Sequence, residues 1–317
     1  MVLPRFKREL DDEGRPKPIQ LTGMSGARFT ASAEYFRVAL EEKPDDPSIL
    51  SNYGNWLKER GELDEAEAAY RKAITSDDGF ANAHGNFAIV LDDRGDVDSA
   101  EREYRRAVEL DGQSTIHAAN LAFFLWRRRQ DRETGERLFR EAMGRQRDAF
   151  TVGRLALFTD LALGDKEQAR QLYDEVLGIA PDDPWAHGRL AEFLQREGDI
   201  DAAREHFKRA TAGEHPDHDA LLGYAELRVR EGAVEPAVEL LRRAMKLRPR
   251  NPDALAMLAA TRTLLGAPGA DLERMYRQVL EWDPRHALTV LNLAQLLLRR
   301  DAADEEAREF VTRCRPR

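Results

Sequence analysis

The stretch Asn86–Val108, NFAIVLDDRGDVDSAEREYRRAV, predicts two short amphipathic helices joined by a polar turn. In each half, apolar or small side chains recur at the three- and four-residue spacing of one helix face: Phe87, Ala88 and Leu91, then Ala100, Tyr104, Ala107 and Val108. Gly95 ends the first helix, and Asp98 is the predicted N-cap of the second. Because each helix is too short to be stable alone, we expect the stretch to fold only when it is stacked on similar units.

Three sets of positions recur along the chain in steps of 34 or 35 residues. The first set is aromatic or apolar: Phe36, Tyr70, Tyr104, Phe139, Tyr173, Phe207, Leu241, Tyr276 and Phe310. The second set is small: Gly54, Ala88, Ala122, Ala156, Ala191, Ala225, Ala259 and Ala294. The third follows the first by three residues: Ala39, Ala73, Ala107, Ala142, Val176, Ala210, Ala244 and Val279. Three sets in phase predict an array of helical repeats.

This spacing, the three sets and the prolines that close several units (Pro44, Pro181, Pro249 and Pro284) resemble the tetratricopeptide repeat (TPR) family from Phe29 to the C-terminus. The resemblance implies an all-α fold, a right-handed α-α superhelix of helix-turn-helix repeats whose first helices line the concave side. It implies little about biology, because a shared scaffold does not fix a function.

The expected organisation has three parts. Residues 1–25 are an irregular N-terminal extension rich in Pro and Gly, residues 26–46 a capping helix that forms half a repeat, and residues 47–317 eight tandem repeats. The repeats begin near Pro47, Ala81, Thr115, Ala149, Pro184, His218, Pro252 and Ala287. The extension is either a surface-draped tail or an occupant of the groove through Ile19–Met24. The polar last helix, Ala303–Arg313, either caps the array or precedes further chain.

Charge and composition exclude several classes of protein. The net charge of −9 argues against general nucleic-acid binding, which needs a basic face. The single cysteine suits a reducing compartment, and no run of 18 apolar residues predicts a membrane span, so we expect a cytoplasmic protein. We find no catalytic constellation, metal-ligand spacing or phosphate-binding loop, and therefore expect neither enzymatic activity nor a cofactor.

One position of the first helix holds asparagine in three successive repeats and arginine in the next two: Asn52, Asn86, Asn120, Arg154 and Arg189. A carboxamide donates and accepts, so it can bind both the N–H and the C=O of a peptide main chain. Packed helices lie ~8–10 Å apart and an extended chain advances ~3.3 Å per residue, so an asparagine would meet a bound peptide about every third residue. The arginines suit carboxylate or phosphate groups.

The asparagines resemble the ladder in the repeat domain of O-linked N-acetylglucosamine transferase, which implies contact with the main chain of a bound peptide. The alternative is that they bond neighbouring repeats. The arginines have an alternative too, internal pairing with Asp160, Glu192 or Glu226. Lysine and arginine do not recur in three successive repeats as in a full carboxylate clamp, so binding of a chaperone C-terminal tail is disfavoured.

Three apolar residues, Ile89, Phe123 and Trp126, are the predicted anchors for ligand side chains. The next residue, Phe124, is better placed for the core, so we expect Phe123 to face the groove. The alternative is that Phe123 or Trp126 turns inward. The basic run Arg127–Arg129 with Arg132 is either a solvated loop or a contact for an acidic partner or phosphate.

The sequence therefore predicts a non-enzymatic scaffold that holds an extended peptide or a partner's tail in a concave groove, with acidic groups read by the arginines. Two alternatives stay open. The chain is the substrate-recruiting part of a larger enzyme or complex, such as a glycosyltransferase-type assembly, or it is a module that associates with its own copies as a homo-oligomer.

Overall fold

The structure, a computed structural model, describes residues 33–301 and 304–313. Helices make up the regular structure of these residues: α1 (Ala33–Glu42), α2 (Pro47–Glu59), α3 (Leu63–Ser76), α4 (Ala81–Asp93), α5 (Val97–Leu110), α6 (Thr115–Arg129), α7 (Arg132–Arg145), α8 (Ala149–Phe158), η1 (Thr159–Leu163), α9 (Lys166–Ile179), α10 (Pro184–Glu197), α11 (Ile200–Thr211), α12 (His218–Arg230), α13 (Val234–Leu247), α14 (Pro252–Leu264), α15 (Gly269–Trp282), α16 (Ala287–Arg300) and α17 (Glu305–Arg313). The predictions for residues 1–25 fall outside the described residues, and so does the single cysteine, Cys314.

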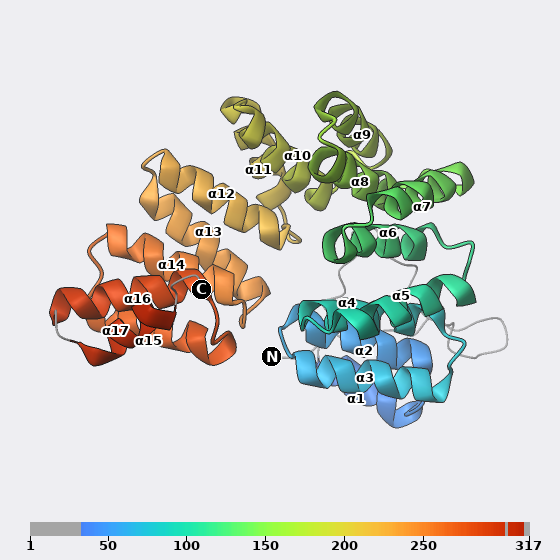
Figure 1. The fold of residues 1–317 in the computed structure, drawn as a ribbon, viewed down its shortest axis with the longest axis horizontal. Helices are drawn as coiled ribbons and strands as arrows, with labels where there is room; N and C mark the ends of the chain where they lie inside the picture. The colour runs from blue at the N-terminus through green and yellow to red at the C-terminus, as the bar shows by residue number, and fades with distance from the viewer. Residues whose placement is uncertain (1–32, 302–303, 314–317) are drawn as a thin grey trace, which may run out of the picture.

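The helices form a superhelical array of helix-turn-helix pairs, as the all-α prediction requires. Each of the eight first helices begins at the residue named from the sequence, and each packs against the helix that follows it. Before them, α1 packs Phe36 against Tyr53 and Trp56 of α2, with ring centroids 5.2 and 5.9 Å apart. Figure 1 shows that the pairs follow an arc whose two ends face each other.

Polar residues in the turns determine where the helices begin. Aspartate N-caps accept backbone N–H groups that the first helical turn leaves unpaired: Asp46, Asp96, Asp131, Asp148, Asp165, Asp183, Asp199 and Asp217. The predicted cap Asp98 is wrong. Asp96 caps α5 by accepting from the Ser99 N–H at 3.2 Å, because the helix already begins at Val97.

The recurring aromatic and small residues form the core between successive helices. Tyr70, Phe139 and Phe207 are each fully buried, and the alanines of the second and third sets, apart from the half-buried Ala39, have little or no exposed surface. Small residues at these positions let the helices approach closely enough for the rings to fill the space between them. The core is therefore a row of clusters along the array, as expected of repeats that contact mainly their neighbours.

The first helices lie on the inside of the curve. First helices of successive repeats pack on one another, as α2 does on α4, α6 on α8, α10 on α12 and α14 on α16. Curvature also brings distant turns together, since a Cβ added to Gly61 would lie 3.1 Å from the Cβ of Arg250. The two halves of the array thus face each other across the inner side of the curve (Figure 1).

The fourth repeat contains an irregularity that the repeat pattern does not predict. Its first helix, α8, continues as the single π turn η1, which Gly164 ends with a φ of 70°. Two leucines of this turn, Leu161 and Leu163, remain 48% and 42% exposed. The π turn therefore presents apolar surface at the end of a groove-lining helix.

Candidate functional site: the inner surface of the array

Two of the three predicted asparagines bond to neighbouring repeats. The Asn86 amide donates from Nδ2 to Ser51 Oγ at 3.2 Å, and Asn120 Oδ1 accepts from Arg154 at 3.3 Å. Asn120 is 9% exposed, whereas Asn52 and Asn86 are half-buried. These bonds correspond to the alternative that the asparagines connect repeats. They use the Nδ2 donor of Asn86 and the Oδ1 acceptor of Asn120. Asn86 can therefore still accept through Oδ1, and Asn120 can still donate through Nδ2.

Arg154 lies over an aromatic ring, and no carboxylate in the described part of the chain pairs with its positive charge. Its guanidinium carbon is 4.1 Å from the centroid of the Phe123 ring, a cation–π contact. Its Nε is buried without a hydrogen-bond partner, and among the described residues no carboxylate lies within ion-pair distance of it. Burial, together with the nearby cations Arg127 and Arg189, lowers the pKa of Arg154 to about 10.

Arg189, one repeat further, is paired internally as the alternative expected. Its Nη1 lies 3.1 Å from Glu192, and its Nη2 lies 3.6 Å from Asp219. The other two predicted acceptors have different partners, because Asp160 binds Arg196 and Glu226 binds Arg230. The two arginines of the same register therefore differ: Arg189 is neutralised and Arg154 is not.

The prediction that Phe123 faces the groove is wrong. Phe123 is 7% exposed and packs in the cluster of Phe139 and Phe158, and Arg154 covers the remaining face of its ring. Ile89 and Trp126 are half-buried, and Trp126 packs edge-on against Phe123 with centroids 5.1 Å apart. Small neighbours such as Ala119 and Ala162 leave room for the ring. The apolar surface at this site is consequently smaller than the sequence indicates.

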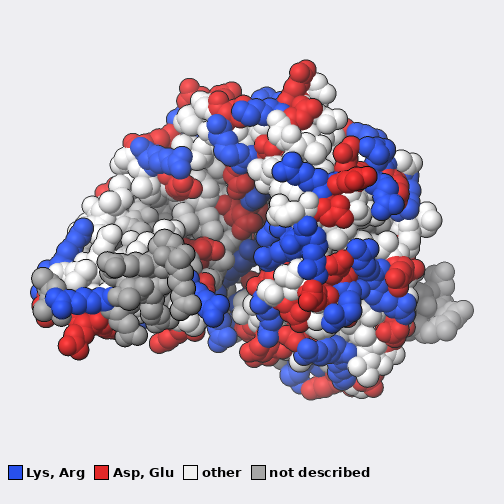
Figure 2. Space-filling model, in the orientation of Figure 1, with Lys and Arg blue, Asp and Glu red and all other residues white. Residues whose placement is uncertain are grey.

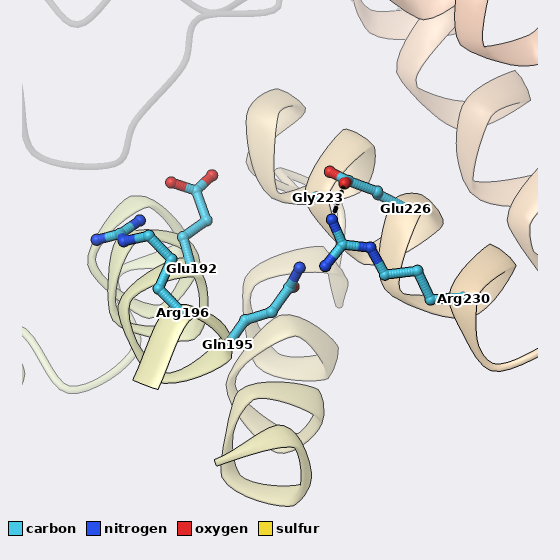
Figure 3. A pocket seen from close by; sticks show the side chains of 6 residues that line it. All are labelled: Glu192, Gln195, Arg196, Gly223, Glu226 and Arg230. Carbon is cyan, nitrogen blue, oxygen red and sulfur yellow. Dashed lines mark hydrogen bonds and ion pairs between the residues drawn. The ribbon is translucent and has the colours of Figure 1, made fainter. Parts of the chain in front are cut away.

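A hollow of about 290 Å³ opens on the inner surface between α10 and α12. Its lining combines charged and polar side chains: Glu192, Gln195, Arg196, Gly223, Glu226 and Arg230. Figure 3 shows Glu226 and Arg230 bound to each other, while Glu192 pairs with Arg189. Burial raises the pKa of Glu192 despite the attraction of Arg189. Figure 2 shows acidic and basic side chains both lining the space between the two halves of the array.

Arg127, which the sequence placed in a basic turn, lies in the helix α6 beside this surface. It is the thirteenth residue of α6, one helical turn after Phe123, and its guanidinium carbon lies 5.8 Å from the centroid of that ring. The spacing of four residues from Phe123 is the sequence signal that identifies it. Its neighbours Arg128 and Arg129 instead bind Asp92 and Glu101 of the preceding repeat.

Two buried histidines occupy equivalent places in the second and fifth repeats. His84 Nε2 lies 3.1 Å from the Asp78 carbonyl oxygen, and its Nδ1 lies 2.6 Å from Glu103. His187 Nε2 lies 2.9 Å from the Pro181 carbonyl oxygen, but its Nδ1 lies 2.9 Å from Nδ1 of a second histidine, His206. A carbonyl oxygen only accepts hydrogen bonds, so each Nε2 carries a proton. The group that faces Nδ1, Glu103 or His206, then decides whether the ring is favoured in its charged form.

The two pairs have opposite responses to pH. Burial opposes protonation of His84, but its bonds to Glu103 and Asp78 prevail and raise its pKa. Burial lowers the pKa of His187 and of His206, and each has cationic neighbours that lower it further. The His84 pair thus favours folding below about pH 6.5 and loses that contribution as pH rises, whereas the His187 pair favours folding above about pH 6.5 and loses it on acidification.

We expect His206→Glu to reduce the loss of stability that the protein shows on acidification from about pH 7.5 to 5.5. Glutamate at this position gives His187 the partner that His84 has, so protonation of His187 no longer opposes folding. The midpoint of thermal unfolding, measured across this range, checks the expectation. The reverse swap, Glu103→His, should steepen the loss, and parallel curves for the three proteins would show that the pair does not control the response.

Neither a metal centre nor a membrane segment emerges from residues 33–301 and 304–313. No three His, Cys, Asp or Glu side chains gather closely enough there to hold a metal ion. Within the same ranges, no helix combines the length and apolarity needed to cross a membrane.

Sequence comparison identifies the family. Models of the tetratricopeptide repeat match residues 57–122, 160–218 and 194–261, and a second tetratricopeptide model matches residues 24–82. These matches cover more than half of the chain, so the chain belongs to the tetratricopeptide repeat family. No curated protein matches the chain by sequence.

Solved structures with the same fold share little sequence with this chain. Human IFIT1, solved as a dimer with PPP-AAAA, has a TM-score of 0.61 and 17% identity over 84% of this chain and 71% of its own. Yeast Tom70 has a TM-score of 0.59 and 18% identity over 88% of this chain and 61% of its own. Cut9–Hcn1 of the APC/C has a TM-score of 0.53 and 15% identity over 83% of this chain and 52% of that chain. The present chain thus spans about half of that one, and the likeness shows the fold alone.

Proposed function

We propose that the protein is a non-enzymatic scaffold that binds an extended peptide, or the tail of a protein partner, along the inner surface of its array. The observation that carries this proposal is the alignment of half-buried polar side chains along one register of the first helices. Asn52 and Asn86 lie at this register in α2 and α4, and Arg154 continues it in α8. Amide groups that repeat along a groove suit a peptide main chain, whose donors and acceptors also repeat.

The three asparagines have different roles in this proposal. Asn52 and Asn86 contact the main chain, Asn86 through the Oδ1 that its bond to Ser51 leaves available. Asn120, which is nearly buried, positions the Arg154 side chain through its Oδ1. Arg154 and Arg189 bind acidic groups of the peptide, with Arg189 exchanging Glu192 for a ligand carboxylate. Ile89 and Trp126 offer partly exposed apolar surface beside them, and Phe123 supports Arg154 from below.

We expect Asn86→Ala to weaken binding of a pool of degenerate peptides by about three- to tenfold, because a net hydrogen bond contributes about 0.5–1.5 kcal/mol. Asn52→Ala should act in the same direction. Binding to the intact chain is measured by fluorescence anisotropy of the labelled pool, and circular dichroism checks that the variants keep their helix content.

The matched control is Gln171→Ala, which removes an exposed carboxamide from α9, a second helix on the outside of the curve. It should leave peptide binding unchanged. Unchanged binding in both Asn52→Ala and Asn86→Ala would refute the asparagine contacts, and absence of binding by the unmodified chain would refute the peptide groove as a whole.

Self-association and recruitment for an enzyme remain as separate hypotheses with direct tests. A homo-oligomer would show a mass that rises with concentration in light scattering. Recruitment for an enzyme would require a catalytic partner that co-purifies with the intact chain and whose activity on its substrate falls in the Asn86→Ala variant.

A further inference from the structure

Arginines on the inner surface are generally neutralised by a nearby carboxylate. Arg189 pairs with Glu192, Arg196 with Asp160, and Arg230 with Glu226. Arg154 and Arg127 are different, since no carboxylate of the described residues lies within ion-pair distance of either. Asp93 attracts Arg127 only from beyond that distance.

The two unneutralised guanidinium groups contact the same aromatic ring, and the charge of Arg127 contributes to the lowered pKa of Arg154. Both contact the ring of Phe123, Arg154 at 4.1 Å and Arg127 at 5.8 Å from its centroid. Asn120 accepts one hydrogen bond from Arg154, and the Arg154 Nε has no partner. A guanidinium has five N–H donors, so this pair presents many unused donors beside the Phe123 ring, which packs in the core. The arrangement is built for an anion that the chain itself does not supply.

The charge of the pair indicates which anion. A single carboxylate would neutralise one guanidinium and leave the other, whereas a phosphate monoester carries about −1.5 to −2 charges at neutral pH and three acceptor oxygens. Arginine binds phosphate through parallel hydrogen bonds. Such bonds would satisfy the Arg154 Nε–H group, which has no hydrogen-bond partner among the residues that the structure describes. A dianion therefore matches Arg154 and Arg127 in both charge and donors.

We infer that Arg154 and Arg127 form a binding site for the phosphate of a phosphorylated serine or threonine in the peptide that occupies the groove. This inference rests on the proposed function. Arg154 shares the register of Asn52 and Asn86, which are proposed to contact the main chain. A phosphate bound at that register lies close to the peptide main chain, so a short side chain can carry it. This favours phosphoserine or phosphothreonine as the phosphorylated residue.

The test compares three pools of short degenerate peptides that differ only at a central residue: phosphoserine, serine or glutamate. We expect the intact protein to bind the phosphoserine pool at least about tenfold more tightly than the serine pool, as charge-assisted hydrogen bonds require. Arg154→Gln and Arg127→Gln should each remove most of this difference in affinity between the phosphoserine and serine pools. Equal binding of the phosphoserine and glutamate pools would overturn the assignment to phosphate.

Arg129→Gln is the matched control. Arg129 lies on the same helix as Arg127, but its Nε binds Glu101 at 2.7 Å and its Nη2 binds Asp98 at 2.5 Å. This variant should keep the full preference for phosphoserine. A preference that survives in Arg154→Gln, or that falls equally in Arg129→Gln, would overturn the site.

Inorganic phosphate gives a second measurement that needs no peptide. It should raise the thermal midpoint of the unmodified chain and of Arg129→Gln more than sodium chloride of equal ionic strength, and it should not do so in Arg154→Gln. Peptide binding that depends on Asn86 without a preference for phosphoserine would overturn this inference and leave the proposed function standing. A phosphate response that depends on Arg154, with no binding of any peptide pool, would support the anion site and overturn the proposed function instead.

Discussion

Phe139→Ala should lower the free energy of unfolding by about 3–5 kcal/mol, the usual cost of removing a buried phenylalanine. The ring is fully buried at the centre of the third repeat and lies 5.2 Å from the ring of Phe158 in the next. In an array, stability depends on each unit and on its contacts with neighbours. The loss should therefore also uncouple the repeats on either side, so that a single unfolding transition becomes two.

Urea unfolding followed by circular dichroism and by tryptophan fluorescence checks this expectation. Trp126 packs 5.7 Å from Phe158 and reports on the affected region, whereas Trp282 lies in α15, far along the array. The control Leu288→Ala removes a leucine that is 66% exposed and should change stability by less than about 0.5 kcal/mol. If the two variants lose the same stability, the row of buried rings is not what holds the repeats together.

The sequence predicted the fold well because the same constraints recur in every repeat. A ring such as Tyr104 needs a small residue such as Ala88 on the facing helix, and a glycine such as Gly95 is needed where the backbone turns. Each requirement appears again 34 or 35 residues later, so the period and the start of each first helix could be read directly. What occurs once, such as the π turn at Thr159–Leu163, has no repeated signal and was not predicted.

The candidate site was less predictable, because side chains at one register can have different neighbours. Position in the helix placed Asn86 and Arg154 on the inner surface, but the distance between repeats decided that Asn86 also reaches Ser51. Phe123 was expected to be exposed, yet it fills space beside Phe158 while Arg154 covers it. Such choices depend on the local separation and rotation of two helices, which hydrophobic periodicity does not encode.

The second large effect is expected at Gly54, where Gly→Ala should destabilise the protein by about 1–3 kcal/mol, as overpacking of a core does. A Cβ at this position would lie 2.6–2.9 Å from three atoms of the Tyr70 ring. The ring has little room to move, because Tyr70 is fully buried and its hydroxyl donates to Asn55 Oδ1 at 2.7 Å. Relief thus requires α2 and α3 to separate, which would loosen the first repeat.

The same substitution at Gly144 should have the opposite sign. Gly144 lies in α7, and a Cβ added there meets no atom within 4 Å, so alanine should stabilise the protein by about 0.5–1 kcal/mol through its better helix propensity. Thermal unfolding of the two variants separates the effect of packing from that of propensity, because both change glycine to alanine within a helix. Stabilisation by Gly54→Ala would mean that α2 and α3 do not pack as closely around Tyr70 as the described geometry requires. The contrast then tests the physical basis of the repeat itself: small residues are present at this position because a ring on the facing helix occupies the space that a side chain would need.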